Sequence, residues 1–406
     1  MLKKIPTDQV ELGMYLHSME GSWLSHPFWK TKFQITNSAD LLALRSSKVP
    51  HVWINISLGK DVEGPEADLP RGPTAEVPLP EPSTRTRRPA PPRPVSVADE
   101  LEEASSIMRQ SRTAVVDMLN EARMGQAVHR DTATAVVDSI AGSVWRNPSA
   151  LISLARLKTR DDYTYMHSVA VCAMMIALGR QLGLSEAEQR LAGEGGLLHD
   201  VGKMLMPLEV LNKPGQLTDE EFAIMKAHPE RGHAALVASG GFGPEVLEVC
   251  LHHHEKMDGN GYPHRLAGEQ ITLLSRMGAV CDVYDAVTSV RPYKQAWDPA
   301  VSLARMAQWK GHFDPKVFQA FIVSVGIYPV GTLVRLQSGK LAVVIDQNPG
   351  KLTSPKVRVF FSTKSNMPIQ TRDLDLGTDS SDRILGREDP EPWGFTHLND
   401  LWTQAG

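Results

Sequence analysis

Seven histidine and aspartate side chains in the middle of the chain have the residue types and spacing to bind metal ions. His199 and Asp200 are adjacent and follow an apolar run, and the other candidates lie in separate apolar segments, at His167, His228, His253, His254 and Asp282. Imidazole and carboxylate groups are costly to bury unless they are paired or bind a metal. A single histidine in a helix is usually a core or surface residue, but this set predicts one metal centre.

The candidates divide into two ligand sets that share Asp200. One octahedral ion would take His167, His199, Asp200 and Asp282, and a second would take Asp200, His228, His253 and His254. Two ions about 3.5–4 Å apart with a bridging hydroxide form a nucleophile for in-line attack on a phosphodiester. Ligands this rich in imidazole favour iron, manganese, nickel or zinc over magnesium.

Three cations are placed to bind the charge of a phosphodiester substrate. Lys203 follows Asp200 by three residues and can reach a phosphate oxygen, while Arg291 and Lys294 follow the segment of Asp282 and can clamp a second phosphate. With the ligand sets, these residues predict a hydrolytic metal centre.

Predicted helices carry every candidate ligand. Apolar residues at spacings of three and four predict helices over residues 163–182, 186–200, 219–228, 246–254 and 271–287. Capping boxes support two of the starts, Ser185 with Glu188 and Thr218 with Glu221. We therefore expect a mainly α protein of several domains, in which an all-α bundle holds the metal centre between its helices.

The segment before the bundle predicts a small N-terminal domain. Residues 1–62 contain strand-like runs at 10–16 and 51–56 and a short helix at 40–44, which is typical of a small α+β regulatory module. Its aromatic residues form either a hydrophobic mini-core or a surface for a ligand or partner: Trp23, Pro27, Phe28, Trp29 and Phe33.

A linker and two further helices connect this domain to the bundle. Ten of the 28 prolines lie in residues 63–99, where large apolar residues are scarce, so this segment is expected to be a flexible linker. Its arginines offer the alternative of a phosphate-binding arm: Arg85, Arg87, Arg88 and Arg93. Helices in residues 100–145 either cover the body of the bundle, whose domain spans 100–325, or contact a second subunit or signalling partner.

The end of the chain changes to the period-two pattern of strands. Residues 332–336 and 341–345 flank a Ser338-Gly339 turn and predict a hairpin, and alternating apolar residues at 357–361 predict a third strand. We expect residues 326–406 to form a short β appendage that ends near residue 375, followed by a polar, loosely held tail.

Composition excludes several other classes of protein. The chain has 406 residues, 42% hydrophobic and 22% charged, with a formal net charge of −4, which gives no basic field for nucleic acid or an anionic membrane. No apolar run reaches the roughly 20 residues of a membrane helix. The N-terminal segment lacks the apolar run of a signal peptide. Three separate cysteines, Cys172, Cys250 and Cys281, indicate buried thiols in a reducing compartment, so we expect a cytoplasmic protein.

The order and spacing of the motifs resemble the HD-GYP family of the HD metal-phosphohydrolase superfamily. The resemblance spans residues 145–325, and its motifs include HDVGK at 199–203, HHE at 253–255, DGNGYP at 258–263, DVYDA at 282–286 and RPYK at 291–294. Residues 1–62 are similar to the domain of unknown function that often precedes an HD-GYP domain. The resemblance implies hydrolysis of cyclic di-GMP, a second messenger that controls biofilm formation and motility in bacteria.

The resemblance also implies roles for individual residues. It assigns the seven ligands above to metal binding, Asp200 and Lys203 to catalysis, and the remaining substrate contacts to Arg291, Lys294 and a loop shaped by Gly261, Tyr262 and Pro263. Family members with three metals carry a glutamate four residues before the first histidine, where this chain has Tyr163; Asp162 is one residue out of register. We therefore expect two ions, iron or manganese with nickel or zinc as alternatives, and the end product, linear pGpG or GMP, stays open.

Alternatives exist for the function and for the other polar residues. The domain is either an active phosphodiesterase or a non-catalytic cyclic-dinucleotide sensor, and another cyclic dinucleotide such as cGAMP is a further candidate substrate. Glu255 either orients the ligand pair before it or lies on the surface at a helix end. His252 is expected either to be exposed or to contact a ligand without binding metal itself. The remaining histidines are expected to be structural or exposed: His129, His233, His264 and His312.

Overall fold

The computed structural model describes residues 2–19, 33–36, 38–45, 47, 49, 51–60, 94–157, 163–213, 215–289 and 296–403. These residues divide into two compact units, Met1–Arg85 and Thr86–Gly406, each with its own hydrophobic core. The boundaries expected at residues 62, 99 and 325 stay predictions. Within the described residues, no helix has the length and apolar character needed to cross a bilayer.

In its described residues, the N-terminal unit contains a four-stranded antiparallel sheet and one α-helix, which is the α+β module expected. The sheet has the order β1-β4-β2-β3, and the helix α1 lies in the chain between β3 and β4. The elements are β1 Leu2–Pro6, β2 Tyr15–Met19, β3 Phe33–Gln34, α1 Ser38–Arg45 and β4 His51–Asn55. Strand β2 begins later than expected, because Gly13 has a φ of 93° and lies in a turn. The predicted aromatic cluster and the arginines near the end of the linker lie outside the residues whose side chains are described.

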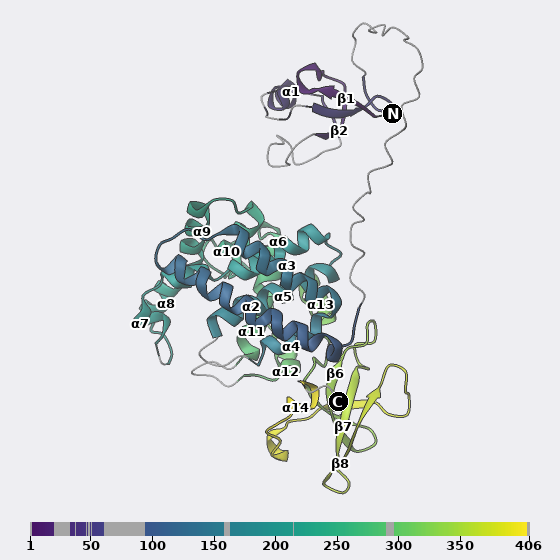
Figure 1. Cartoon of the computed structure of the whole chain (residues 1–406). Helices are drawn as coiled ribbons and strands as arrows, with labels where there is room; N and C mark the ends of the chain where they lie inside the picture. Colours follow the sequence, from purple (N-terminus) through teal and green to yellow (C-terminus); the bar gives the residue numbers. More distant parts are fainter. Residues whose placement is uncertain are drawn as a thin grey trace. The chain divides into compact units, whose positions relative to one another are not determined.

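The second unit is a bundle of helices, as expected (Figure 1). In chain order the helices of the bundle are α2 Val97–Arg123, α3 Arg130–Arg146, α4 Pro148–Ala155, α5 Tyr163–Gln181, α6 Glu186–Leu198, α7 Leu208–Leu211, α8 Asp219–Met225, α9 His228–Ser239, α10 Pro244–His252, α11 Leu273–Thr288, α12 Pro299–Met306 and α13 Pro315–Val325. Helix α5 lies in the centre and contacts α3, α4, α6, α11 and α13. Its buried residues include Val171, Met175 and Leu178.

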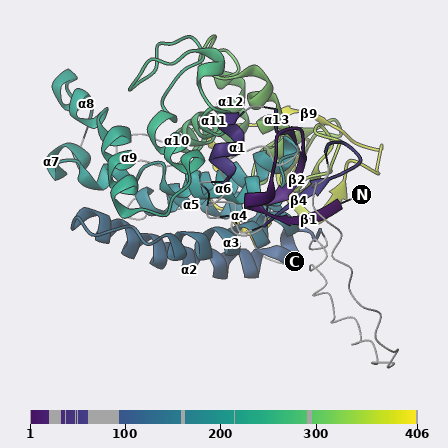
Figure 2. The same ribbon diagram turned by 90° about the horizontal axis from the view of Figure 1, so that it is seen from above.

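The helices α2 and α3 cover the body of the bundle, as one of the two alternatives for residues 100–145 expects, while contact of these helices with a second subunit or signalling partner stays a prediction. Helix α2 runs along one side of the bundle (Figure 2) and packs on α3, α4 and α5 through Leu101, Ile107 and Val115. Near its start, Glu100 is buried and accepts hydrogen bonds from Ser143 and from the guanidinium of Arg146. This buried ion pair attaches the first turn of α2 to the end of α3.

The helix expected to continue to His228 is divided into two. Helix α8 ends at Met225 and α9 begins at His228, with Pro229 in its first turn. Proline lacks the N–H that would bond to the carbonyl four residues earlier, and its ring clashes with that carbonyl. The helix is therefore interrupted before Pro229, and the carbonyl of Met225 is left without its helical partner.

The C-terminal segment is more extensive and better packed than expected. The predicted hairpin and third strand belong to a five-stranded antiparallel sheet of order β8-β7-β6-β5-β9: β5 Leu333–Leu336, β6 Lys340–Asp346, β7 Lys356–Ser362, β8 Met367–Asp375 and β9 Ile384–Arg387. The tail is not loosely held, because β9 pairs with β5 and the short helix α14 Asp400–Thr403 contacts β6 and α2, with Trp402 only 3% exposed. Its apolar residues complete the core of the sheet.

Candidate metal centre

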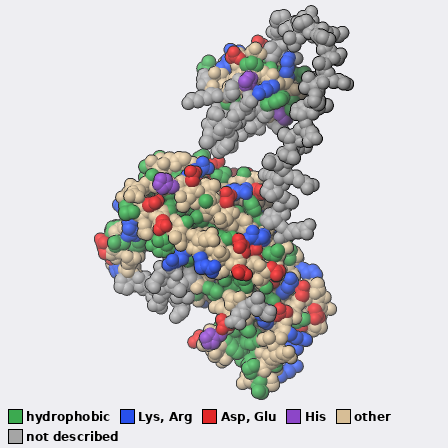
Figure 3. All heavy atoms as spheres, in the orientation of Figure 1, with side chains coloured by type: hydrophobic (Ala, Val, Ile, Leu, Met, Phe, Trp, Pro, Cys, Tyr) green, Lys and Arg blue, Asp and Glu red, His purple; other side chains and the backbone are tan. Residues whose placement is uncertain are grey.

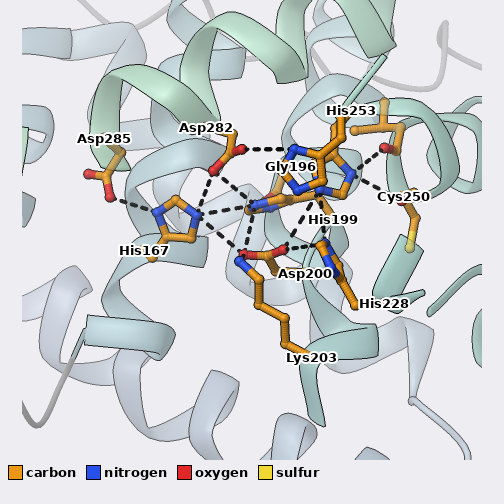
Figure 4. A network of polar contacts seen from close by, with 12 residues as sticks. His167, Gly196, His199, Asp200, Lys203, His228, Cys250, His253, Asp282 and Asp285 are labelled. Carbon is orange, nitrogen blue, oxygen red and sulfur yellow. Dashed lines mark hydrogen bonds and ion pairs between the residues drawn. The ribbon is translucent and has the colours of Figure 1, made fainter. Parts of the chain in front are cut away.

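The first expected ligand set comes together between α5, α11 and the turn after α6. His167 Nε2 lies 3.1 Å from Asp282 Oδ1 and 3.4 Å from Asp200 Oδ2, and His199 Nε2 lies 3.2 Å from the same Asp200 oxygen. All four side chains are buried, and their potential ligand atoms lie within 4.8 Å of one another (Figure 4). This geometry is compact enough for one ion.

The second expected set lies on the other oxygen of Asp200. His228 Nε2 is 3.2 Å from Asp200 Oδ1 and His253 Nε2 is 3.7 Å from it. His254 completes this group and also lies with its Nδ1 3.7 Å from Asp282 Oδ2. Because each oxygen of Asp200 faces a different group of imidazoles, its carboxylate lies between two potential ion sites.

Helix ends fix the orientation of three of the histidine rings. The Nδ1 atoms of His199, His228 and His253 lie 2.8–3.1 Å from backbone carbonyl oxygens of Gly196, Met225, Val249 and Cys250. A carbonyl only accepts hydrogen bonds, so each Nδ1 carries a proton and each Nε2 is the ring nitrogen left to bind an ion. Carbonyls in the last turn of a helix generally lack helical partners. The imidazoles bond to such carbonyls here, although the Val249 carbonyl also accepts the backbone N–H of His253.

The donor atoms fit a transition-metal ion. The Nε2 atoms of His199, His228 and His253 face the carboxylate of Asp200. In the neutral form that binds a metal, their lone pairs repel this carboxylate unless a cation lies between them. Asp200 Oδ1 is buried and has no hydrogen-bond partner among the described residues, although it belongs to a charged carboxylate. An ion bound by imidazole nitrogen and carboxylate oxygen would remove both costs.

The pKa values follow from burial and from these contacts. Burial raises the pKa of Asp200, but nearby His199 and Lys203 and a hydrogen bond from His167 outweigh it and hold the pKa well below its usual range. Burial lowers the pKa of His254 to about 3 and that of His253 well below its usual value. The carboxylate is therefore ionised and these two imidazoles are neutral, which are the states that bind metal.

His167 is different, because three carboxylates surround it. Burial lowers its pKa, but hydrogen bonds to Asp200, Asp282 and Asp285 raise it to about 10. A ligand must lose its proton before it binds an ion. At neutral pH, therefore, metal and proton compete for this imidazole.

This competition predicts proton release during metal loading. Because His167 keeps its proton up to a pH of about 10, we expect the apparent affinity of metal-free protein for Mn²⁺ to rise roughly tenfold per pH unit between about pH 6.5 and 8. Calorimetry in two buffers of different ionisation enthalpy measures the released proton directly. Identical binding heats in both buffers would contradict the protonated state of His167.

Asp285 is a further candidate residue of this site, and the family motifs assigned no role to it. It lies one turn after Asp282 on α11, is 1% exposed, and its Oδ2 is 2.7 Å from His167 Nδ1. The carboxylate orients the ring so that Nε2 points at Asp200 and Asp282. The spacing of three residues between Asp282 and Asp285 was a signal, because such residues share a helix face.

Asp285→Asn is expected to weaken metal binding without removing a ligand. The amide oxygen of asparagine still accepts the Nδ1 hydrogen bond but lacks the charge that increases the basicity of the ring. Loss of such an outer partner costs about 10–100-fold in metal affinity. Titration of metal-free protein with Mn²⁺ checks this result, and Asp285→Ala, which removes the acceptor as well, should lower the affinity further. Equal affinity of both variants and the parent would contradict the orienting role.

Glu255 has neither of the roles expected for it. It is 2% exposed, so it is not a surface carboxylate, and its oxygens accept hydrogen bonds from the backbone N–H groups of His264 and Leu266. It therefore holds the loop after Gly261. His252 is buried, and bonds to Glu248 and His264 instead of the ligands.

The loop of Gly261, Tyr262 and Pro263 lies against the metal centre. The ring of Tyr262 stacks on that of His254, with centroids 4.7 Å apart. Gly261 passes so close to the backbone of Glu255 that a Cβ atom would lie 2.4 Å from the Glu255 Cα. The loop can therefore reach His254 only with glycine at this position.

The cations expected to bind phosphate have different outcomes. Lys203 is in contact with the centre, because its Nζ lies 2.5 Å from Asp200 Oδ2 (Figure 4). Its side chain is also 25% exposed, which leaves it accessible to a substrate. Arg291 and Lys294 lie outside the described residues, as does Asp162. Tyr163 is the first residue of α5, and its side chain is not among those that the structure describes.

A close backbone contact positions His228 relative to Asp200. The 3-10 helix Val201–Leu205, which follows Asp200, packs on the first turn of α9. A Cβ atom on Gly202 would lie 1.9 Å from the carbonyl oxygen of His228 and 2.6 Å from the N of Gly232. Glycine at position 202 therefore allows the two ligand-bearing segments to approach each other.

Comparison with known proteins gives relatives over the whole chain. Residues 146–317 match the family described as HD domain, and residues 2–133 match a domain of unknown function, DUF3391. The chain is 51% identical to a cyclic di-GMP phosphodiesterase of Pseudomonas aeruginosa, over 99% of this chain and 96% of that protein. It is 41% identical to the cyclic di-GMP phosphodiesterase response regulator RpfG of Xanthomonas campestris, over 44% of this chain and 48% of the relative. A 3'3'-cGAMP-specific phosphodiesterase of Vibrio cholerae is 38% identical over 41% of this chain and 32% of its own length.

Proposed function

From its membership of the family of HD-domain cyclic di-GMP phosphodiesterases, we propose that this chain hydrolyses cyclic di-GMP at a two-metal centre. The observation that carries the proposal is the position of Asp200. Its two oxygens face two separate groups of buried imidazoles, and each group with the carboxylates fits one ion. A shared carboxylate is the arrangement that two-metal phosphodiester hydrolysis needs.

We assign the metal-binding role to His167, His199, Asp200, His228, His253, His254 and Asp282. When bound, the ions supply Lewis-acid activation of water and of the phosphoryl oxygens. The ligands favour iron or manganese, with nickel and zinc as alternatives. The described residues provide two such groups, which supports two ions.

The remaining residues bind and orient the substrate. Lys203, partly exposed beside Asp200, donates to a phosphate oxygen of the substrate, where a positioned cation stabilises developing negative charge. The loop of Gly261, Tyr262 and Pro263 forms one wall beside His254. Arg291 and Lys294 make further contacts to substrate phosphate, and linear pGpG is the first product.

We also propose a regulatory arrangement of domains. Residues 1–62 form an N-terminal regulatory domain, 63–99 a linker, 100–325 the phosphodiesterase domain and 326–406 a C-terminal β region. The match to the domain of unknown function runs through α2 into the first residues of α3, so α2 is the element through which the N-terminal domain acts on the enzyme. A cytoplasmic location, with control of biofilm formation and motility, follows from the proposed substrate.

The test is product analysis with defined metal content. The full chain, purified without oxygen and loaded with Mn²⁺ or Fe²⁺, is incubated with cyclic di-GMP, and products are separated by chromatography. Formation of pGpG supports the proposal, and later appearance of GMP would show a second cut. Tight binding without turnover would identify a sensor instead. Parallel incubation with 3'3'-cGAMP tests the substrate of the Vibrio cholerae relative.

A further inference from the structure

A groove of about 620 Å³ lies beside the metal centre, between α8, the start of α9 and the loop after α10. Its wall includes Tyr262, whose ring stacks on the candidate ligand His254. Ala227, which precedes the candidate ligand His228, forms another part of the wall. The groove is therefore lined by residues that directly adjoin two candidate ligands of the second ion, His228 and His254.

The groove has an excess of positive charge. Lys226, Lys256 and Arg265 line it, with Glu230 as the single carboxylate. Among the residues that the structure describes, no carboxylate lies within ion-pair distance of any of these three cations. The face of the protein in Figure 3, by contrast, mixes basic and acidic side chains. Unpaired cations in a groove favour an anionic ligand.

Aromatic side chains are also exposed to the groove. Phe222 and Tyr262 are part of its wall, and the ammonium of Lys226 lies 4.9 Å from the ring centroid of Phe222. Aromatic faces bind nucleobases by stacking, and cations beside them bind phosphate. This combination is suited to a nucleotide rather than to an inorganic anion.

The backbone at Arg265 is held in an unfavourable conformation. Its φ is 55°, in the left-handed region that glycine adopts more easily. The residues on either side, His264 and Leu266, both donate their backbone N–H to the buried carboxylate of Glu255. Backbone strain of this kind persists only where neighbouring contacts hold it, and such positions occur often at ligand sites. Here the strained residue supplies a cation to the groove.

We infer that this groove binds the second nucleotide of the dinucleotide, while its first phosphate is cut at the metal centre. Lys226, Lys256 and Arg265 bind the phosphate that is not cut, and the rings of Phe222 and Tyr262 contact its base. The inference rests on the proposed function, because it takes a dinucleotide as substrate. The inference adds residues that are not metal ligands to the substrate site. These residues select a dinucleotide over a simple phosphodiester.

The test compares two substrates on the metal-loaded full chain. Cyclic di-GMP carries a second nucleotide, whereas bis(p-nitrophenyl) phosphate carries only the phosphodiester that is cut. Arg265→Gly removes the guanidinium and suits the left-handed backbone, and Arg265→Gln keeps a side chain without charge. Lys226→Met and Lys256→Met remove the other cations, and Lys364→Met, on an exposed turn of the C-terminal sheet, is the matched control.

For cyclic di-GMP, each groove variant is expected to raise KM about tenfold, because a hydrogen bond to a charged group is lost. The ratio of kcat/KM for cyclic di-GMP to that for the small diester should fall by a similar factor, and Lys364→Met should leave the ratio unchanged. A wild-type KM that rises with salt more steeply than that of the triple groove variant would further support the inference.

Two results would overturn the inference, and they are distinguishable. If the wild type hydrolyses cyclic di-GMP and the Arg265 and lysine variants keep its KM within about twofold, the groove does not bind the second nucleotide. If the wild type cuts the small diester but not cyclic di-GMP, both the proposed substrate and the inference are wrong. Thermal unfolding of each variant shows whether a change in KM arises in a folded protein.

Discussion

Asp200→Asn is expected to prevent the binding of both metal ions and to lower kcat for cyclic di-GMP by about 10³-fold or more. The carboxylate faces His167 and His199 with one oxygen and His228 and His253 with the other. A neutral amide presents an N–H₂ group to one of these sets and supplies no negative charge to either. Loss of metal-ion stabilisation worth several kcal/mol corresponds to a rate decrease of this size.

Metal content and turnover should be measured on the same samples of this variant. Asp131→Asn is a suitable control, because Asp131 is exposed in the first turn of α3 and should leave metal content and kcat unchanged. If Asp200→Asn kept two ions per chain, Asp200 would not bridge them. Binding of one ion would show that one imidazole group is sufficient without the carboxylate.

Gly202→Ala is expected to destabilise the protein and to lower the occupancy of the second ion. The new methyl group would lie 1.9 Å from the carbonyl oxygen of His228, which is backbone and cannot rotate away. The segment after Asp200 and the start of α9 must therefore separate, which moves His228 away from Asp200. Overpacking of this kind costs about 1–3 kcal/mol of unfolding free energy, and occasionally more.

Gly142→Ala provides the matched control for this substitution. Gly142 lies inside α3, and the nearest atom to an added Cβ would be 3.7 Å away, on the flexible side chain of Arg146. Alanine is favoured over glycine inside a helix by about 0.5–1 kcal/mol, so this variant should be slightly more stable than the parent. Denaturant unfolding and metal analysis distinguish the two, and equal stability of both variants would contradict the close contact at Gly202.

The sequence predicted the helices of the centre well, because their signals are local. Ser185 and Thr218 open helices with the capping boxes expected of them. His167 and Asp282 lie within apolar helices, and His199 directly follows one that was expected to continue to residue 200 and ends at Leu198. These positions indicated that the three side chains would be buried, and each of them is. Spacing along one helix is therefore sufficient to show which side chains enter the core.

Contacts between elements were harder to predict. Asp285 has the spacing of a buried residue, but its bond to His167 depends on how α11 packs on α5. The hydrogen bonds of Glu255 depend on the path of a loop that returns to it nine residues later. The pairing of β9 with β5 joins segments about fifty residues apart, and a polar tail gives little sign of it. The break at Pro229 was visible in the sequence, and steric reasoning about proline would have found it.

The bonds from His199, His228 and His253 to carbonyls at the ends of helices have a consequence for preparing this enzyme. Each ring is held by the polypeptide and not by what it coordinates, so the pocket stays assembled when it is emptied. Different first-row metals would then exchange without refolding, and their relative supply would decide which is found. The culture medium and the exposure to air during purification should therefore determine the composition of the isolated protein, and chelation followed by reloading should reset it.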